Sequence, residues 1–164
     1  SDLYYLVHKA KELQYHTKMI NSGRYVNDSM GRYIGKKVVK KIISQGKNIL
    51  GAHVLVMGMT FKENVSDIRN SKVADIINEF KDFGAEVDVM DPFASPLEVL
   101  QEYGIRLVER PGKKYDAVVV AVAHTTYLKL DESYFMSITN EHAVLADVKG
   151  VYRGSIHQMI YWSL

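Results

Sequence analysis

Six charged or amide side chains lie within one stretch of thirteen residues, 58–70, which has the sequence GMTFKENVSDIRN. They are Lys62, Glu63, Asn64, Asp67, Arg69 and Asn70. Cationic side chains beside amides and carboxylates can hold phosphates and other charged, hydrogen-bonding ligands. The stretch is therefore the first candidate for a binding site.

The position of this stretch between two predicted elements supports a binding role. Residues 54–57 are a run of apolar side chains typical of a buried strand, and residues 71–83 repeat apolar side chains at helical spacing. Asn70 or Ser71 can cap that helix through a side-chain oxygen. Because the loop from a strand to the next helix lies at the carboxyl edge of a parallel sheet, where ligands bind in α/β proteins, we expect this loop to face a ligand.

Beyond residue 84, strand-like and helix-like patterns continue to alternate, as they do in α/β proteins. The run at 117–122 is apolar without alternation, which is typical of a central strand covered on both faces. We therefore expect an α/β fold with a Rossmann-like, mostly parallel sheet flanked by helices. Further strands are predicted at 86–90, 105–108 and 143–147, and further helices at 96–103 and 131–138.

A helical arm with one long helix, 22–44, is predicted ahead of the sheet. Apolar residues recur every four positions along this helix, and Gly31 and Gly35 would let another helix or a bound group approach closely. With a shorter helix predicted at 3–15, the arm has two helices and too little to bury by itself, so we expect the apolar face to meet a second copy of the chain or a domain outside it. The predicted division is a helical segment at 1–48 and a Rossmann-like domain at 49–164.

The composition excludes several classes of site. The 164 residues include no cysteine, which rules out disulfides, thiolate metal sites and cysteine nucleophiles within this segment. The six histidines have no metal-ligand spacing, so no metal site is expected. No apolar run is long enough to cross a bilayer, and no signal peptide is evident, so we expect a cytoplasmic protein without a membrane partner.

Positive charge is concentrated in the first part of the chain. Residues 1–50 contain ten Lys or Arg against three Asp or Glu, whereas residues 51–164 contain eleven against sixteen. The lysines are spread along a helix without an aromatic stacking pattern, which argues against nucleic acid as a partner. Solvent, an acidic partner surface or the acidic remainder of the chain is the expected neighbour of the arm.

The candidate residues each have a simpler alternative. Lys62 can pair with a diphosphate or can be a solvated loop lysine. Arg69 can grip a phosphate or a carboxamide, or can pair with Asp67 or Glu63. Asp91 follows a predicted strand, where an acid that binds a ribose would lie, but Asp-Pro also opens turns.

Two further residues end predicted strands, and one expected motif is absent. Lys149 could converge on the same ligand as the loop, and His124 could face the cleft or belong to a turn. A dinucleotide-binding loop needs several glycines so that the backbone can touch a pyrophosphate, but here the loop contains only Gly58. A degenerate nucleotide-binding fold is therefore favoured over a complete NAD site.

Several runs of the sequence together resemble one known family, the nucleotide-sugar 6-dehydrogenases. The similar runs are GMTFKENVSDIRNSK, EVDVMDP, YDAVVVAVAH, ADVKGVY and the closing YWSL. They resemble the C-terminal part of these enzymes, most closely the bacterial branch that acts on UDP-N-acetylglucosamine or UDP-N-acetylgalactosamine in capsule and O-antigen synthesis. The arm resembles the central helical segment of the family, so the resemblance covers almost the whole chain.

The resemblance implies a two-step oxidation of the C6 alcohol of a UDP-sugar to a carboxylate with two NAD. In the family a cysteine bonds covalently to the sugar, which divides a difficult oxidation into steps. That cysteine lies just before the pattern D-x-Y-Y-L, which places it upstream of Ser1. The expectation is therefore a C-terminal fragment, inactive alone, of an enzyme whose NAD-binding domain and cysteine lie outside this chain.

The resemblance also assigns roles to residues near both ends of the segment. Asp2 is similar to the acid that follows the cysteine and helps to handle protons and water, with Leu3 in place of the family's proline. Phe61 and Lys62 match a pair that contacts uridine and substrate. Lys149 matches a basic residue near the sugar nucleotide.

Two of the implied contacts reach beyond the chain. Arg69 matches an arginine that reaches NAD on the other domain, and helix 22–44 matches the element through which family members form homodimers. The leading hypothesis is thus the substrate-binding and dimerising portion of an NAD-dependent UDP-sugar dehydrogenase. A non-catalytic dimerising module and a stand-alone nucleotide-binding regulator are the alternatives.

Overall fold

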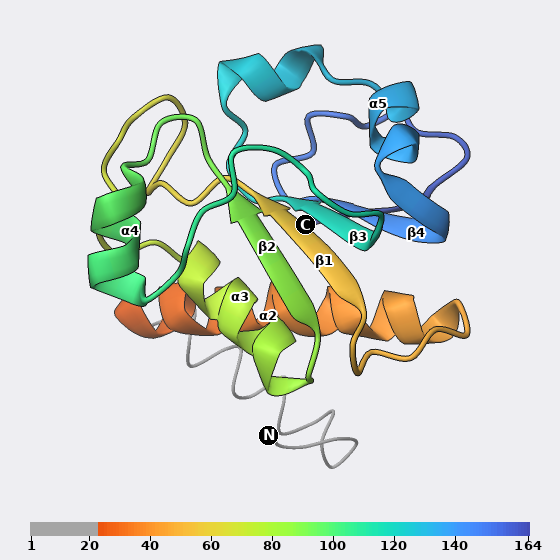
Figure 1. Ribbon diagram of the computed structural model, residues 1–164, viewed down its shortest axis with the longest axis horizontal. Helices are drawn as coiled ribbons and strands as arrows, with labels where there is room; N and C mark the ends of the chain where they lie inside the picture. Colours follow the sequence, from red (N-terminus) through yellow and green to blue (C-terminus); the bar gives the residue numbers. More distant parts are fainter. Residues whose placement is uncertain (1–22) are drawn as a thin grey trace.

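Within residues 23–164, which the computed structural model describes with side chains from residue 30 onward, helices cover both faces of a five-stranded sheet (Figure 1). The strand order is β2-β1-β3-β4-β5, and each pair of neighbours is parallel. The α/β class and the Rossmann-like sheet predicted from the sequence are confirmed.

The sheet agrees with the predicted one except at its two edges. The strands are β1 (His53–Met57), β2 (Glu86–Met90), β3 (Tyr115–Val120), β4 (Thr139–Asp147) and β5 (Ile160–Ser163). The helices are α2 (Gly23–Ser44), α3 (Val73–Asp82), α4 (Pro96–Tyr103), α5 (Glu132–Ser137) and the 3₁₀ helix η1 (Thr125–Lys129). The predicted strand at 105–108 is only a bridge from Leu107 to Val89, and the four-residue edge strand β5 was too short to be recognised.

Successive side chains of the central strands point to opposite faces, and each face has its own hydrophobic cluster. Val54 and Val56 of β1 belong to the cluster that includes α2 and α3, whereas Leu55 and Met57 belong to the cluster beneath η1 and α5. Figure 1 shows these two layers on either side of the sheet. Because both faces are buried, the strands are continuous apolar runs in the sequence.

From Met30 onward, the apolar face of α2 packs within its own chain, so one expectation from the sequence is wrong. Its side chains Ile34, Val38, Val39 and Ile42 are at most 3% exposed and share a cluster with α3 and the sheet. We expected this face to meet a second copy or a domain outside the chain. The sheet, however, has an apolar face of its own to cover, and α2 covers part of it. The assignment of 1–48 and 49–164 to separate domains stays a prediction.

Gly31 and Gly35 allow α2 to approach α3. A Cβ atom on Gly31 would lie 2.7 Å from both Asp75 Cβ and the carbonyl oxygen of Lys72, and one on Gly35 would lie 2.7 Å from Glu79 Cβ. No side chain fits at such distances, so the helices can pack this closely only with glycine at these positions. The predicted close approach of another helix is confirmed.

A buried acid, Glu79 of α3, pairs with two cations of α2. Arg32 Nη1 lies 2.9 Å from Glu79 Oε1, and Lys36 Nζ lies 2.9 Å from Oε2. The two cations are four residues apart, on the same side of the helix, so both reach one carboxylate. Part of the basic arm is thus neutralised by its own chain. None of the helices in residues 23–164 is both long and apolar enough to cross a membrane.

Candidate functional site

The loop between β1 and α3 begins at the carboxyl edge of the sheet with Gly58, which has a φ of 101°. A Cβ at this position would lie 2.6 Å from Val122 Cβ and 2.8 Å from the Val122 amide nitrogen. Gly58 therefore permits close packing against the segment that follows β3. Because Val122 fills the space beside it, this glycine does not offer the open backbone that a dinucleotide pyrophosphate requires.

Asp91, directly after β2, fixes the start of the loop from beneath. Its Oδ2 accepts hydrogen bonds from the amides of Met59 (2.6 Å) and Thr60 (3.1 Å). Its Oδ1 accepts from the amides of Phe93 (2.7 Å) and Ala94 (3.2 Å). The carboxylate is occupied by the protein, so the structure favours the turn interpretation of Asp91 over the ribose-binding one.

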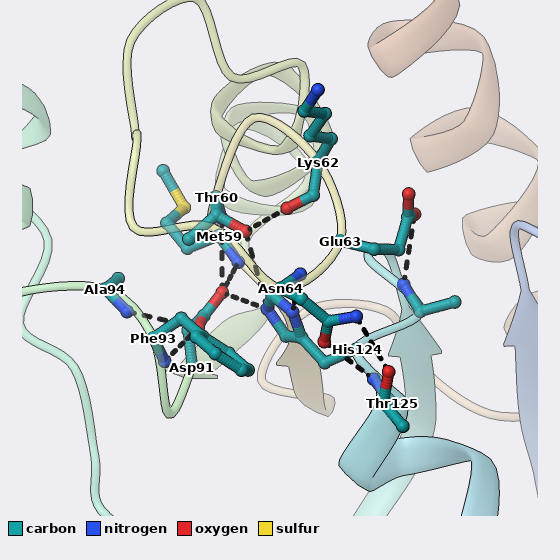
Figure 2. A network of polar contacts seen from close by, with 11 residues as sticks. Met59, Thr60, Lys62, Glu63, Asn64, Asp91, Phe93, Ala94, His124 and Thr125 are labelled. Carbon is teal, nitrogen blue, oxygen red and sulfur yellow. Dashed lines mark hydrogen bonds and ion pairs between the residues drawn. The ribbon is translucent and has the colours of Figure 1, made fainter.

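His124, which follows β3, connects Asp91 to the far side of the same loop (Figure 2). Its Nε2 lies 2.9 Å from Asp91 Oδ2, and its Nδ1 accepts the amide hydrogen of Asn64 at 2.9 Å. Because Nδ1 is an acceptor, the ring proton is on Nε2 and is donated to Asp91. The ring is fully buried and packs on Phe93, with centroids 4.6 Å apart. His124 is thus an interior tether and does not face a cleft.

Hydrogen bonding keeps the buried Asp91 ionised. Burial alone would raise the pKa of its carboxyl group, but the hydrogen bonds from His124 and from the amides of Met59 and Phe93 outweigh that effect and lower the pKa below its ordinary value. A full negative charge therefore lies beneath the loop and is satisfied by the backbone of the loop.

The side chains of Asn64 and Thr60 complete the support of the loop. Asn64 has a φ of 60°, and it exchanges two hydrogen bonds with Thr125: Nδ2 donates to Oγ1 at 2.7 Å, and Oδ1 accepts the Thr125 amide at 2.9 Å. Thr60 Oγ1 donates to the carbonyl oxygen of Lys62 at 2.9 Å. The backbone is thus held on both sides of Phe61 and Lys62.

Three of the residues named from the sequence lie at this edge of the sheet. Phe61 is 54% exposed, and the amino group of the exposed Lys62 extends away from the Asp91–His124 contact in Figure 2. Lys149 follows β4, and its Nζ lies 3.7 Å from Glu63 Oε2. The loop therefore meets the segment after β4 through Glu63 and Lys149. Glu63 is also the neighbour of Lys62 in the sequence, so one acid lies beside both lysines.

Glu63 is the member of this group whose role the sequence analysis missed. Its Oε2 accepts the amide of Ala123 at 3.4 Å as well as contacting Lys149. Burial would raise the pKa of Glu63, but a hydrogen bond from its own amide and the charge of Lys149 outweigh burial and lower the pKa. Its opposite charge to Lys149 was visible in the sequence, but the pairing of positions 63 and 149 was not.

Arg69 lies near the end of the loop and is held by Asp67. Its Nε is 3.0 Å from Asp67 Oδ1 and its Nη2 is 2.9 Å from Oδ2, which lowers the pKa of Asp67 to about 2. The ion pair considered as the simpler alternative is thus present, yet the Arg69 side chain is still 81% exposed. A contact of Arg69 with NAD stays a prediction.

Two further predictions concern the role of Asp2 and the presence of a metal site. Asp2 lies outside the described residues. Within residues 23–164, no three His, Cys, Asp or Glu side chains are grouped so that they could hold a metal ion.

A comparison with known protein families identifies the type of domain that carries this loop. Residues 55–154, which run from β1 through the loop to the segment after Lys149, match the UDP binding domain of the UDP-glucose/GDP-mannose dehydrogenase family. The chain belongs to this family. The resemblance to nucleotide-sugar dehydrogenases drawn from the sequence is confirmed.

Individual relatives agree with the family assignment. The UDP-N-acetyl-D-glucosamine 6-dehydrogenase of Pseudomonas aeruginosa is 40% identical over 90% of this chain and 35% of its own length. Protein CapL of Staphylococcus aureus is 39% identical over 92% of this chain and 35% of its own length. The solved UDP-N-acetyl-mannosamine dehydrogenase Cap5O of Staphylococcus aureus superposes with a TM-score of 0.66 and 28% identity, over 89% of this chain and 33% of its own. The chain thus spans about a third of the length of these relatives.

Proposed function

We propose that this chain is the substrate-binding portion of an NAD-dependent UDP-sugar 6-dehydrogenase and holds the UDP part of the substrate at loop 58–70. The observation that carries the proposal is the exposure of Phe61, Lys62 and Lys149 at one edge of a domain that belongs to a UDP-binding family. The lysines can make charge-assisted hydrogen bonds to a diphosphate, and the phenylalanine ring offers an apolar face to the uracil base.

The parent enzyme in this proposal oxidises the C6 alcohol of a UDP-N-acetylhexosamine to the uronate in two steps, for capsule or O-antigen synthesis. The names of the relatives, which include UDP-N-acetyl-D-glucosamine 6-dehydrogenase and UDP-N-acetyl-mannosamine dehydrogenase, support this substrate class. The 164 residues contain no cysteine, so the covalent nucleophile of the proposed reaction is assigned to another part of the enzyme. The chain alone is expected to bind nucleotide without oxidising it.

Among the residues that the structure describes, those around the loop fit a peripheral contact with NAD and not a complete NAD site. Val122 fills the space at Gly58, whereas the exposed guanidinium of Arg69 can be reached by a group that another domain holds. NAD, when bound, supplies the hydride acceptor for each oxidation step. In the proposal Arg69 orients that cofactor, and Asp67 holds the guanidinium in place until then.

The proposal also includes a homodimer through helix 22–44, although the structure leaves fewer apolar residues of that helix for an interface than the sequence suggested. The apolar side chains from Ile34 to Ile42 are used within the chain, Lys36 pairs with Glu79 of α3, and Lys40 is exposed. A dimer through this helix would therefore have to use other side chains, such as Ile43, which is 49% exposed. Light scattering of the purified chain tests this: a mass of one chain at micromolar concentration contradicts it.

Calorimetric titration with UDP tests the nucleotide site directly. We expect the unmodified chain to bind UDP, and Lys62→Ala to weaken binding at least about tenfold, the effect of losing roughly 1.4 kcal/mol of charge-assisted hydrogen bonding. Lys81→Ala, at an exposed lysine in the last turn of α3 near the opposite edge of the sheet, is the matched control and should bind as the parent does. Absence of binding at millimolar UDP, or equal losses in both variants, contradicts the proposal.

A further inference from the structure

We infer that Asp91 and His124 are positioning residues for the nucleotide: they determine the affinity for UDP by fixing the loop that carries Phe61 and Lys62, without touching the ligand. This inference rests on the proposed function. Both side chains are fully buried, whereas the two residues that they position are exposed.

The middle of the loop, residues 61–67, has no fully buried apolar side chain. Met59 and Ile68 are buried at its two ends, but every residue from 61 to 67 is exposed or only partly buried. Apolar burial therefore cannot hold Phe61 and Lys62 in one conformation. Hydrogen bonds have to do so. One lies within the loop, from the amide of Phe61 to the carbonyl oxygen of Asp67 (2.6 Å), and others join the loop to groups beneath it; a loop without them would be mobile.

Asp91 and His124 supply those hydrogen bonds on both sides of the exposed pair. The Asp91 carboxylate binds the amides of residues 59 and 60, immediately before Phe61. The His124 ring binds the amide of Asn64, two residues after Lys62. Since the ring also donates to the carboxylate, the two attachment points are joined through one contact. This Asp91–His124 pair, the tether of the loop, bonds to the main chain and leaves the side chains of Phe61 and Lys62 available.

Burying a carboxylate beneath a loop is unfavourable unless its hydrogen bonds hold the loop in one arrangement. Removing an ionised group from water costs several kcal/mol, and an apolar residue of similar size would often be as stable. Asp91 recovers this cost because five donors surround it: four amides and the His124 ring. Such a saturated network specifies one arrangement of the groups around it, and a fixed loop loses less conformational entropy when it binds a ligand.

Two substitutions of His124 separate the two halves of the tether. His124→Asn keeps an acceptor near the position of Nδ1 and so keeps the bond to Asn64. His124→Gln keeps a donor near the position of Nε2, toward Asp91, but loses the acceptor for Asn64. We expect His124→Gln to weaken UDP binding about tenfold and His124→Asn to stay within about threefold of the parent, because a lost hydrogen bond in a fixed loop is worth that range.

A charge-removing substitution at the opposite edge of the sheet is the matched control. Asp116, the second residue of β3, is a partly buried carboxylate that accepts hydrogen bonds from the amide of His53 (3.0 Å), from Lys47 Nζ (3.2 Å) and from Asn140 Nδ2 (3.1 Å). Asp116→Asn removes the charge of a hydrogen-bonded carboxylate far from the loop. It should lower the melting temperature while the dissociation constant for UDP stays within about twofold of the parent.

The decisive experiment combines UDP titration with amide hydrogen exchange of residues 59–64 in these variants. Faster exchange of these amides and weaker UDP binding in His124→Gln, but not in Asp116→Asn, support the inference. Unchanged exchange, or equal UDP affinity in His124→Gln and the parent, overturns it. Asp91→Asn, which replaces one of the two carboxylate oxygens that accept the amides around the loop, repeats the test at the other positioning residue should His124→Gln not fold. Should the unmodified chain itself fail to bind UDP, the proposed function fails, and exchange still decides whether the tether holds the loop.

Discussion

His124 Nε2 lies 2.9 Å from Asp91 Oδ2, and neither side chain is exposed to solvent. Asp91 follows β2 and His124 follows β3, the two strands that flank β1 in the sheet. Their side chains therefore meet directly beneath the loop that follows β1. The loop is thus supported by the ends of both neighbouring strands, which explains how a charged stretch keeps a defined shape.

The depressed pKa of Asp91 predicts a pH-dependent contribution to stability. A carboxyl group whose pKa is lower in the folded state stabilises the fold above its unfolded pKa of about 3.9, and this contribution disappears as the pH falls through the folded pKa. We expect Asp91→Asn to lower the unfolding free energy at pH 7 by about 3 kcal/mol, with a difference from the parent that narrows below about pH 4. Urea unfolding at a series of pH values measures this, and a difference that stays constant with pH contradicts the assignment.

The contact between α2 and α3 predicts a steric effect at Gly31. A methyl group there would lie 2.7 Å from the carbonyl oxygen of Lys72, an atom that cannot move without the helix. Gly31→Ala should therefore destabilise the protein by about 2 kcal/mol, despite the higher helix propensity of alanine. Gly112→Ala is the control, because a Cβ there meets no atom within 4 Å. Equal melting temperatures for the two variants would show that the helices can separate freely.

Two carboxylates that contact the same arginine should differ in their energetic value. Arg32 Nη1 lies 2.9 Å from Glu79 and 2.7 Å from Asp82, whose side chains are 6% and 67% exposed. Glu79→Ala leaves two cations facing a buried gap and should cost about 3 kcal/mol, whereas Asp82→Ala should cost at most about 0.5 kcal/mol. Chemical denaturation of both variants decides. Similar losses would mean that proximity to Arg32, and not burial, sets the energy.

Within the proposed nucleotide site, Glu63 is expected to weaken the binding of an anion. Its carboxylate lies 3.7 Å from Lys149 and partly neutralises that lysine. Glu63→Gln removes the charge while keeping an acceptor for the amide of Ala123, so we expect UDP to bind about threefold more tightly. Calorimetry at two salt concentrations tests this, because the gain should shrink as salt screens Lys149. Weaker binding by the variant would show that Glu63 positions the loop or contacts the ligand.

Much of the fold could be predicted because the signals are local. The apolar run from Val54 to Met57 and the helical spacing that begins at Val73 identify strand and helix within a few residues of each other. The same patterns gave the position of the charged loop at the carboxyl edge. Gly31 and Gly35 also predicted a close contact, but only the structure identified α3 as the approaching helix.

The error over α2 has the same physical origin. An amphipathic pattern states that a face must be buried, and it does not state against what. The face that includes Val38 and Ile42 could have met another chain, a missing domain or the sheet that follows it. Only the folded structure decides among these, and in it the face packs against the sheet and α3.

The sequence by itself thus determined the α/β class, the order of the elements, the family resemblance and the choice of Phe61, Lys62 and Lys149 as site candidates. Only the tertiary structure revealed that Asp91 and His124, 33 residues apart, hold the loop, and that Glu63 contacts Lys149 across 86 positions. The reason is that hydrophobic periodicity is a property of neighbouring residues. A polar network is a property of distance in space, which strand order and register set after the chain has folded.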